Sequence, residues 1–260
     1  MSAPATLSAP ITSDTIETLN NRVSVRDFTD RPVEDATVDA ILQAAFRAPT
    51  SSNIQAYSVL IVRDQAVKDK LAPVTGNQQH VIKTPVFLAF CADLTRIEDA
   101  FKRHGHTLDN NNLEFGLVSS VDAALVGMSA YVAADSLGLK GVMIGAVRND
   151  AVKTAEILGL PQRVYCLFGM CLGWPGDVPD QKPRMDYGAM VHYDQYGNQG
   201  AHSDKHAVVD RYDAQLAAHY EGQGKPTAPD SWSHEVDAKF SGGIRQGLRE
   251  QLKQRGFDFE

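Results

Sequence analysis

The sequence LFGMCLGWPGDVPDQKPR (residues 167–184) passes from an apolar run into a segment with three prolines. The apolar run, residues 164–172, is short and bounded by turn residues, so we expect a buried strand. The segment 174–184 cannot continue that strand, because proline lacks the backbone donor that a sheet needs. It should therefore form an irregular loop on the surface.

Three further segments resemble this strand, and helical patterns lie between the four. The predicted strands cover residues 57–62, 86–92, 140–144 and 164–172. Helices are expected at 14–20, 34–48, 65–72, 94–103, 112–137, 150–158, 205–221 and 233–255. Two helices separate the strand at 86–92 from the strand at 140–144, so strands and helices do not alternate strictly. This order favours an α+β sandwich over a doubly wound Rossmann sheet.

The longest predicted helix, residues 112–137, carries small residues on nearly all sides and ends at Gly138. Its large apolar side chains repeat at helical spacing and line one face: Leu117, Val121, Ala124, Leu125, Met128 and Val132. From residue 204 onward the chain is helical, polar and weakly apolar, which suggests an arm around a partner subunit. We therefore divide the chain into a flexible lead (1–13), a core (14–203) and a C-terminal extension (204–260).

Composition limits the function classes. The 260 residues are 43% apolar and 22% charged, as in an ordinary soluble protein, and the net charge of −7 argues against a nucleic-acid partner. No segment approaches the roughly 20 uncharged apolar residues of a membrane helix, and the N-terminus lacks a secretory signal. Three cysteines in apolar runs indicate buried thiols and a cytoplasmic, reducing location. On one regular strand, Cys166 and Cys171 would point to opposite faces.

Several common catalytic motifs are missing from the sequence. It contains no GxGxxG, GxxxxGK[ST], HExxH, CxxC or GxSxG pattern. We therefore predict no metal site, no Rossmann dinucleotide site and no serine nucleophile.

Residues 21–28 (NRVSVRDF) form the first candidate site, because Arg22, Ser24 and Arg26 alternate after a predicted helix. In an extended chain these side chains face the same way, and two guanidiniums with a hydroxyl can hold a phosphate. The same pattern would also fit a surface turn with ordinary ion pairs.

Four other segments could complete a pocket for a phosphorylated heterocycle. Residues 48–55 offer amide and hydroxyl donors, the turn 75–80 is polar, and the strand end at 144–146 permits close approach of a flat ring. The pair Lys182 and Arg184 could reach a phosphate. Each segment alone also fits a structural role as a capping loop, surface turn, strand end or solvated basic turn. The candidate residues are Ser51, Ser52, Asn53, Gln55, Gln78, His80, Ile144, Gly145, Ala146, Lys182 and Arg184.

In this order and spacing, the segments resemble the nitroreductase superfamily, in its branch of oxygen-insensitive NADPH nitroreductases and NADPH-FMN reductases. The resemblance spans residues 15–255 and rests on motifs at 21–28, 48–55, 75–81, 136–150 and 167–184. It implies a three-layer sandwich with a mixed central sheet and a homodimer with exchanged C-terminal arms. It also implies FMN in two interface pockets. The Arg-x-Ser-x-Arg run and the Lys-Pro-Arg loop would bind the flavin phosphate, and the other candidate residues would surround the ring and ribityl chain.

The resemblance further implies ping-pong hydride transfer from NADPH through the flavin to nitroaromatics, quinones or flavins. Glu114 falls where the branch has a carboxylate near the pocket, although it would also suit the helix dipole. In this branch, a loop before a Trp-Ser pair usually carries arginines that hold the NADPH 2′-phosphate. The corresponding loop here, residues 222–230, has Lys225 as its only cation, so the use of NADH stays open. Two alternatives also remain: a dedicated FMN reductase that supplies a partner, and a flavin carrier or sensor without turnover.

Overall fold

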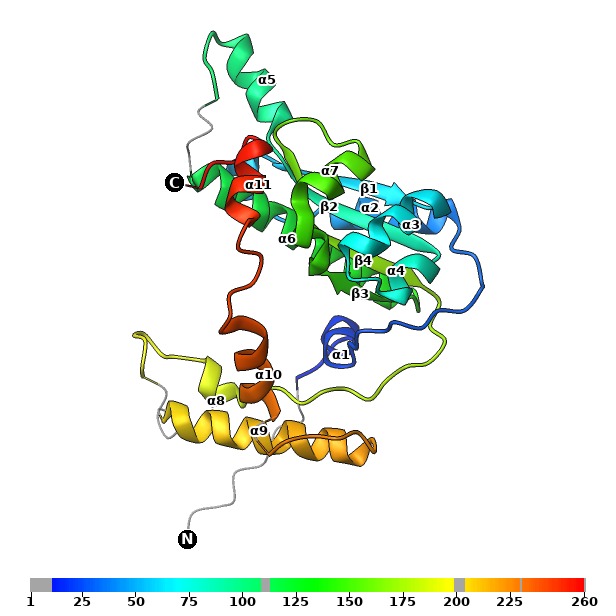
Figure 1. Ribbon diagram of the computed structural model, residues 1–260, viewed down its shortest axis with the longest axis vertical. Coiled ribbons are helices and arrows are strands. Elements are labelled where there is room, and N and C mark those ends of the chain that lie inside the picture. The colour runs from blue at the N-terminus through cyan, green and yellow to red at the C-terminus, as the bar shows by residue number, and fades with distance from the viewer. Residues whose placement is uncertain (1–10, 109–112, 199–203, 230, 260) are drawn as a thin grey trace. The chain divides into compact units, whose positions relative to one another are not determined.

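The computed structural model describes residues 11–108, 113–198, 204–229 and 231–259, in two compact units (Figure 1). The first unit is Met1–Pro179 with Gly247–Glu260, and the second is Asp180–Gln246. Compactness thus divides the chain at 179/180 and 246/247, whereas the change in composition placed a boundary at 203/204. Most of the predicted lead, 1–13, lies outside the described residues.

A four-stranded antiparallel sheet organises the first unit, in the order β1-β2-β4-β3. An isolated parallel bridge between Ser24 and Gly141 adds a parallel pairing at the β3 edge. All four predicted strands are present within one residue of their expected ends, and the predicted α+β class is confirmed. The strands are β1 (Tyr57–Val62), β2 (Val86–Asp93), β3 (Lys140–Ile144) and β4 (Val164–Gly173).

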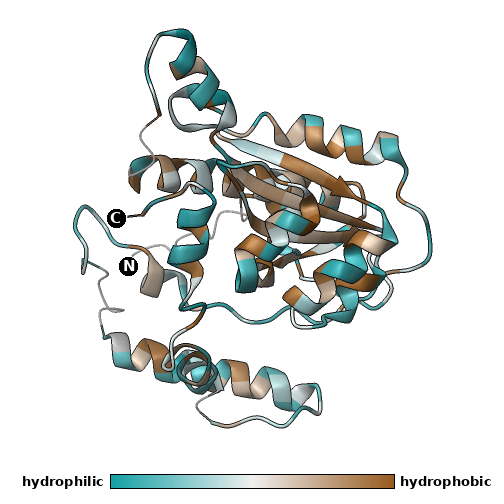
Figure 2. Cartoon of the chain, turned by 45° about the horizontal axis from the view of Figure 1, so that its top comes forward, coloured by the Kyte–Doolittle hydropathy of each residue, from teal (hydrophilic) through white to brown (hydrophobic). Residues whose placement is uncertain are grey.

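Helices cover both faces of this sheet and make three layers (Figure 1). One apolar cluster lies under α2 (Asp35–Ala45) and α6 (Leu113–Ser136). The other lies under α3 (Gln65–Val74), α4 (Gln79–Lys83) and α7 (Ala151–Leu158). Every residue of β2 is buried, as expected for a central strand with both faces covered. Figure 2 shows the strands as largely hydrophobic between helices of mixed character.

The remaining elements are short or belong to the second unit. In the second unit, the Asp213 carboxylate accepts from the backbone nitrogens of Trp232 and Ser233 at 2.7 and 2.8 Å. Asp213 lies in α9 (Lys205–Gly222), and its carboxylate pairs two of the free N–H groups at the start of α10 (Ser231–Phe240). This contact links the two helices. The first unit adds α1 (Asp14–Asn20), η1 (Ser51–Asn53), α5 (Thr95–Arg103), η2 (Gly145–Asp150) and α11 (Leu248–Gln254). The second contains α8 (Tyr187–Met190), α9 (Lys205–Gly222) and α10 (Ser231–Phe240).

Two predicted helices differ in extent from those observed. Pro73 lies inside the last turn of α3 rather than ending it, because only one intrahelical bond is lost there. The helix predicted at 233–255 is two helices, α10 and α11. Gly243, with φ of +78°, lies between them in a conformation that a helix cannot contain.

The two cysteines of β4 lie on the same face of the sheet, so the expectation of opposite faces is wrong. Phe90 pairs with Phe168 but Cys91 pairs with Cys166, which leaves Leu167 as an extra residue in β4. This β-bulge shifts the alternation by one. Cys166 and Cys171 therefore both join the cluster under α3, α4 and α7. Burial raises the pKa of the Cys171 thiol, which keeps it protonated.

Helix α6 packs on the sheet through small residues rather than through its large apolar side chains. A Cβ on Gly127 would lie 2.4 Å from the Phe168 ring, so only glycine fits this close approach. The predicted apolar face is exposed instead, with Leu117 at 49% and Val121 at 54%. By length and composition alone α6 could cross a membrane, contrary to the sequence expectation, but its other face belongs to the core of the first unit.

Candidate functional site

Residues 22–28 run extended beside β3. The Val25 nitrogen donates to the Gly141 oxygen at 3.1 Å, and the Val25 side chain is fully buried. Arg22 and Ser24 share the opposite side, where the Arg22 Nη1 donates to the Ser24 Oγ at 3.3 Å. The structure thus has the alternation that an extended chain predicts.

Tyr131 of α6 holds this segment against the sheet, a contact that the sequence did not reveal. Its hydroxyl donates to the backbone oxygens of Val23 at 2.6 Å and Gly141 at 3.0 Å. Its ring centroid lies 5.5 Å from the Arg22 guanidinium carbon. Burial raises the pKa of the Tyr131 phenol, although the Arg22 charge partly opposes this, so the hydroxyl stays a donor. In the sequence, the one sign of a special role for Tyr131 is that a tyrosine stands among the small residues of this helix.

His80 of α4 brings a second predicted segment near the first. Burial, and secondly the charge of Arg26, lower the pKa of the His80 imidazole. Its Nε2 atom is buried and has no hydrogen-bond partner among the described residues. An unpaired buried ring nitrogen within the field of a guanidinium is a natural contact for a ligand oxygen.

The titration of His80 should report on what binds near Arg26. We expect Arg26→Ala to raise the His80 pKa, because a nearby positive charge is removed. Saturating FMN should also raise it if the flavin phosphate compensates that charge. Proton NMR of the imidazole across a pH series measures both shifts. Arg31→Ala, whose guanidinium lies over the Trp174 ring, serves as the control and should leave the His80 pKa unchanged. An unchanged pKa in Arg26→Ala would contradict the prediction.

The loop 51–55 has an unusual backbone. Ser52, Asn53 and Gln55 all have positive φ, at +46°, +56° and +50°. Asn77, in the predicted turn 75–80, shares this conformation at +55°. Each costs roughly 1 kcal/mol or more for a non-glycine residue, and such strain concentrates at functional sites. The side chains of Ser51, Ser52, Asn53 and Gln55 are exposed.

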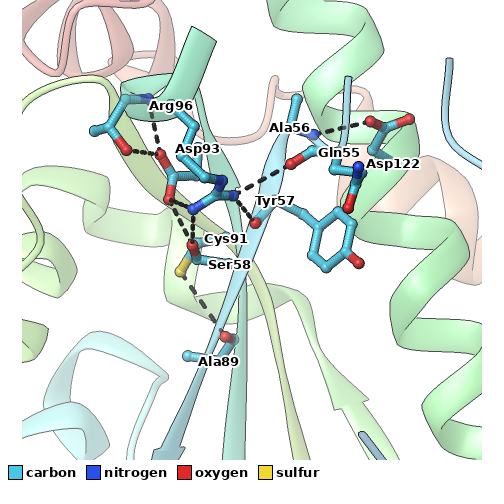
Figure 3. Close-up of polar contacts among 10 residues, drawn as sticks. Gln55, Ala56, Tyr57, Ser58, Ala89, Cys91, Asp93, Arg96 and Asp122 are labelled. Atoms are coloured by element: carbon cyan, nitrogen blue, oxygen red, sulfur yellow. Dashed lines mark hydrogen bonds and ion pairs between the residues drawn. The ribbon is translucent and has the colours of Figure 1, made fainter. Parts of the chain in front are cut away.

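Two residues that the sequence did not reveal fix this loop (Figure 3). The Asp122 carboxylate of α6 accepts from the Ser51 and Ala56 nitrogens, each at 3.0 Å. Arg96 of α5 donates to the backbone oxygens of Gln55, at 3.2 Å, and Tyr57. A carboxylate in the middle of a helix, among mostly small and apolar residues, was the signal for Asp122. Nothing local marked Arg96.

The strand end at 144–146 is the third predicted surface. Ile144 is buried, whereas Gly145 and Ala146 are half-buried and begin η2. Arg148 lies over this turn, because a Cβ built on Gly145 would be 3.4 Å from its Nη2 atom. The Arg148 guanidinium also donates to the backbone oxygen of Leu167, the extra residue of β4.

The other candidates lie apart from these segments or in the second unit. Glu114 is exposed in the first turn of α6, about 12 Å along the helix axis from Asp122. In the second unit the Lys182 Nζ donates to the Tyr220 hydroxyl at 2.5 Å, and Arg184 binds the Pro183 oxygen at 3.1 Å. The Lys225 Nζ donates to the Gln223 Oε1 at 2.6 Å.

Comparison with known proteins identifies the family. Residues 19–174 match the Nitroreductase family, and residues 182–260 match the C-terminal domain described for that family. This chain belongs to the nitroreductase family. The expected superfamily and branch are confirmed.

Named relatives of this nitroreductase cover almost the whole chain. The oxygen-insensitive NADPH nitroreductase of Salmonella typhimurium is 39% identical, over 94% of this chain and 98% of its own. The FMN reductase (NADPH) of Bacillus subtilis is 33% identical, over 95% and 99%. The solved NADPH:FMN oxidoreductase of Vibrio harveyi, in complex with NAD+, has a TM-score of 0.85 at 33% identity, over 95% and 100%.

Proposed function

We propose that this nitroreductase is an FMN-dependent enzyme that takes hydride from NADPH and passes it to nitroaromatics, quinones or flavins. The observation that carries the proposal is the run of Arg22, Ser24 and Arg26 beside β3, next to a buried and unpaired His80 nitrogen. The names of the relatives above support both FMN and NADPH.

The donor set fits FMN. Arg22, Ser24 and Arg26 supply two guanidiniums and a hydroxyl for the terminal phosphate, with charge-assisted bonds. The polar loop 51–55 and the turn with Gln78 and His80 supply donors for the ring edge and ribityl chain. Gly145 and Ala146, half-buried at the end of β3, carry little or no side chain and are proposed to lie against the flavin ring, with the Arg148 guanidinium beside them. Lys182 and Arg184 are proposed as further phosphate ligands.

When bound, FMN supplies the atom that accepts hydride from NADPH and passes it on. The protein needs no general base of its own for that chemistry, and Glu114 has at most an auxiliary role. The residues of this chain hold the cofactor, orient the ring and keep water from it. Arg148, over the strand end, adds a positive charge on this side of the site.

A homodimer would cover the exposed apolar face of α6. Large side chains recur along it at helical spacing, and a soluble monomer rarely exposes so continuous a stripe. The second unit also exposes aromatic residues, which suits the proposed exchange of arms between subunits. That exchange concerns residues 180–246, because α11 packs on α7 within the first unit. The exposed α6 residues are Leu113, Leu117, Val121, Leu125 and Met128.

All three cysteines are free and buried. This state suits a reducing compartment and supports the proposed cytoplasmic location.

The choice of nicotinamide cofactor should depend on Lys225. We expect Lys225→Ala to raise the KM for NADPH about tenfold while leaving that for NADH nearly unchanged, because one charge-assisted bond to the 2′-phosphate is lost. Steady-state kinetics with both donors measures this. Lys239→Ala, in α10 of the same unit, is the matched control. Equal effects on both donors would remove Lys225 from the cofactor site.

An acceptor panel tests the function itself. The purified protein should be yellow, bind one FMN per chain, and reduce a nitrofuran and a quinone with NADPH in stopped-flow and steady-state assays. Rates high only with free FMN would favour the dedicated flavin reductase. Flavin binding without NADPH oxidation would indicate a carrier or sensor.

A further inference from the structure

The strained loop 51–55 is held at both ends by side chains from two different helices. On one side Asp122, with an exposed fraction of 0%, accepts the Ser51 and Ala56 nitrogens with its two separate oxygens. These two nitrogens bracket the left-handed residues Ser52, Asn53 and Gln55. A single buried carboxylate thus holds both the N-terminal and the C-terminal end of the loop.

A second tether acts on the carbonyl side of the same loop. Arg96 donates to the oxygens of Gln55 and Tyr57, and Asp93 and Ser58 orient its guanidinium at 3.1 and 3.2 Å (Figure 3). Burial raises the pKa of the Asp93 carboxyl, but hydrogen bonds from Ser58 and Thr95 outweigh burial and hold the pKa below its ordinary value. Asp93 therefore stays ionised and keeps Arg96 in place.

We propose that Asp122 and Arg96 are positioning residues that hold loop 51–55, before any ligand binds, in the conformation that receives the flavin ring edge. This rests on the proposed FMN site. Left-handed serine, asparagine and glutamine residues would relax in an untethered loop, since their conformation is costly. The tethers remove that freedom in advance, so binding does not have to order the loop.

The chemistry of Asp122 makes the proposal specific to a carboxylate. Both backbone partners are N–H donors, so both side-chain atoms must be acceptors. In Asp122→Asn one acceptor becomes an NH2 group that faces a backbone N–H, and one buried donor loses its partner. The volume of the side chain is unchanged.

Hydrogen exchange and the properties of bound flavin test this. In the FMN-free protein, Asp122→Asn should speed exchange of the Ser51 and Ala56 amides. In the FMN-bound protein it should weaken FMN about tenfold to a hundredfold, as the loss of one charge-assisted bond implies, and should shift the reduction potential and visible spectrum of the flavin. A loss of stability alone would not move the potential or spectrum. Asp135→Asn is the matched control, since Asp135 lies in the same helix and pairs with Lys140 at 2.7 Å.

Arg96→Gln gives an independent test, because its half-exposed side chain can be replaced without a cavity. Its matched control is Arg103→Gln, in the same helix and paired with Asp99. Arg96→Gln should also shift the flavin spectrum and weaken FMN, and the control should not.

The outcomes separate the two proposals. A wild-type protein that takes up no FMN would refute the proposed function and this inference together. A yellow wild type whose Asp122→Asn and Arg96→Gln variants bind FMN with unchanged affinity, potential and spectrum would refute the inference alone. Unchanged amide exchange in Asp122→Asn would also refute it.

Discussion

A protein in which Arg22 and Arg26 are both replaced by alanine should be purified without flavin. The phosphate of FMN carries about two negative charges, and burial without cations leaves them uncompensated. Two charge-assisted interactions of about 1.5–3 kcal/mol each correspond to an affinity lower by roughly a hundredfold to ten-thousandfold. Flavin fluorescence on titration of the FMN-free protein measures the dissociation constant.

The control variant also removes two positive charges, but from a helix outside the proposed phosphate site. Lys102 and Arg103 in α5 form ion pairs with Glu98 and Asp99 at 3.2 and 2.7 Å. Replacing both by alanine changes the net charge equally and should leave FMN bound. Tight FMN binding by the Arg22→Ala/Arg26→Ala protein would contradict the assignment of the phosphate to this segment.

The second large effect concerns α6. We expect Val121→Asp combined with Leu125→Asp to convert a dimer into monomers at micromolar concentration. In a two-fold interface each substitution occurs twice, so four carboxylates would replace apolar side chains that each contribute about 1.5–3 kcal/mol on burial. Sedimentation velocity measures the change in mass.

Ile61→Asp is a suitable control, because Ile61 is also apolar and 44% exposed but lies on β1. It should leave the dimer intact. A wild-type protein that is monomeric at these concentrations, or a dimeric double variant, would refute the proposed interface.

The sequence predicted the elements better than their contacts. All four strands and the core helices α2, α3, α6 and α7 follow from local apolar patterns and from Pro and Gly boundaries, so their positions could be read directly. The short helix α4 was not predicted, because its residues were interpreted as part of a polar turn. The contacts of Tyr131 with Val23 and of Arg96 with Gln55 join residues 108 and 41 positions apart. No local pattern encodes such pairs.

The orientation of α6 was unpredictable for a different reason. Both of its faces are apolar, and periodicity alone does not say which one meets the sheet. Small residues decided this, because they allow the helix to approach Phe168. Cys166 lies on its observed face of the sheet because Leu167 is an extra residue in β4. The composition of the strand does not predict the position of such a bulge.

Leu167 also connects strand β4 to the proposed flavin site through Arg148. The oxygen of Leu167 accepts from Arg148, and the same guanidinium lies over Gly145. A one-residue deletion that made β4 regular would invert the facing of the residues that precede it and leave this guanidinium without its anchor. Protein engineers who idealise the strand would therefore disturb the proposed flavin site from the interior of the sheet, without changing any of the proposed flavin-binding side chains.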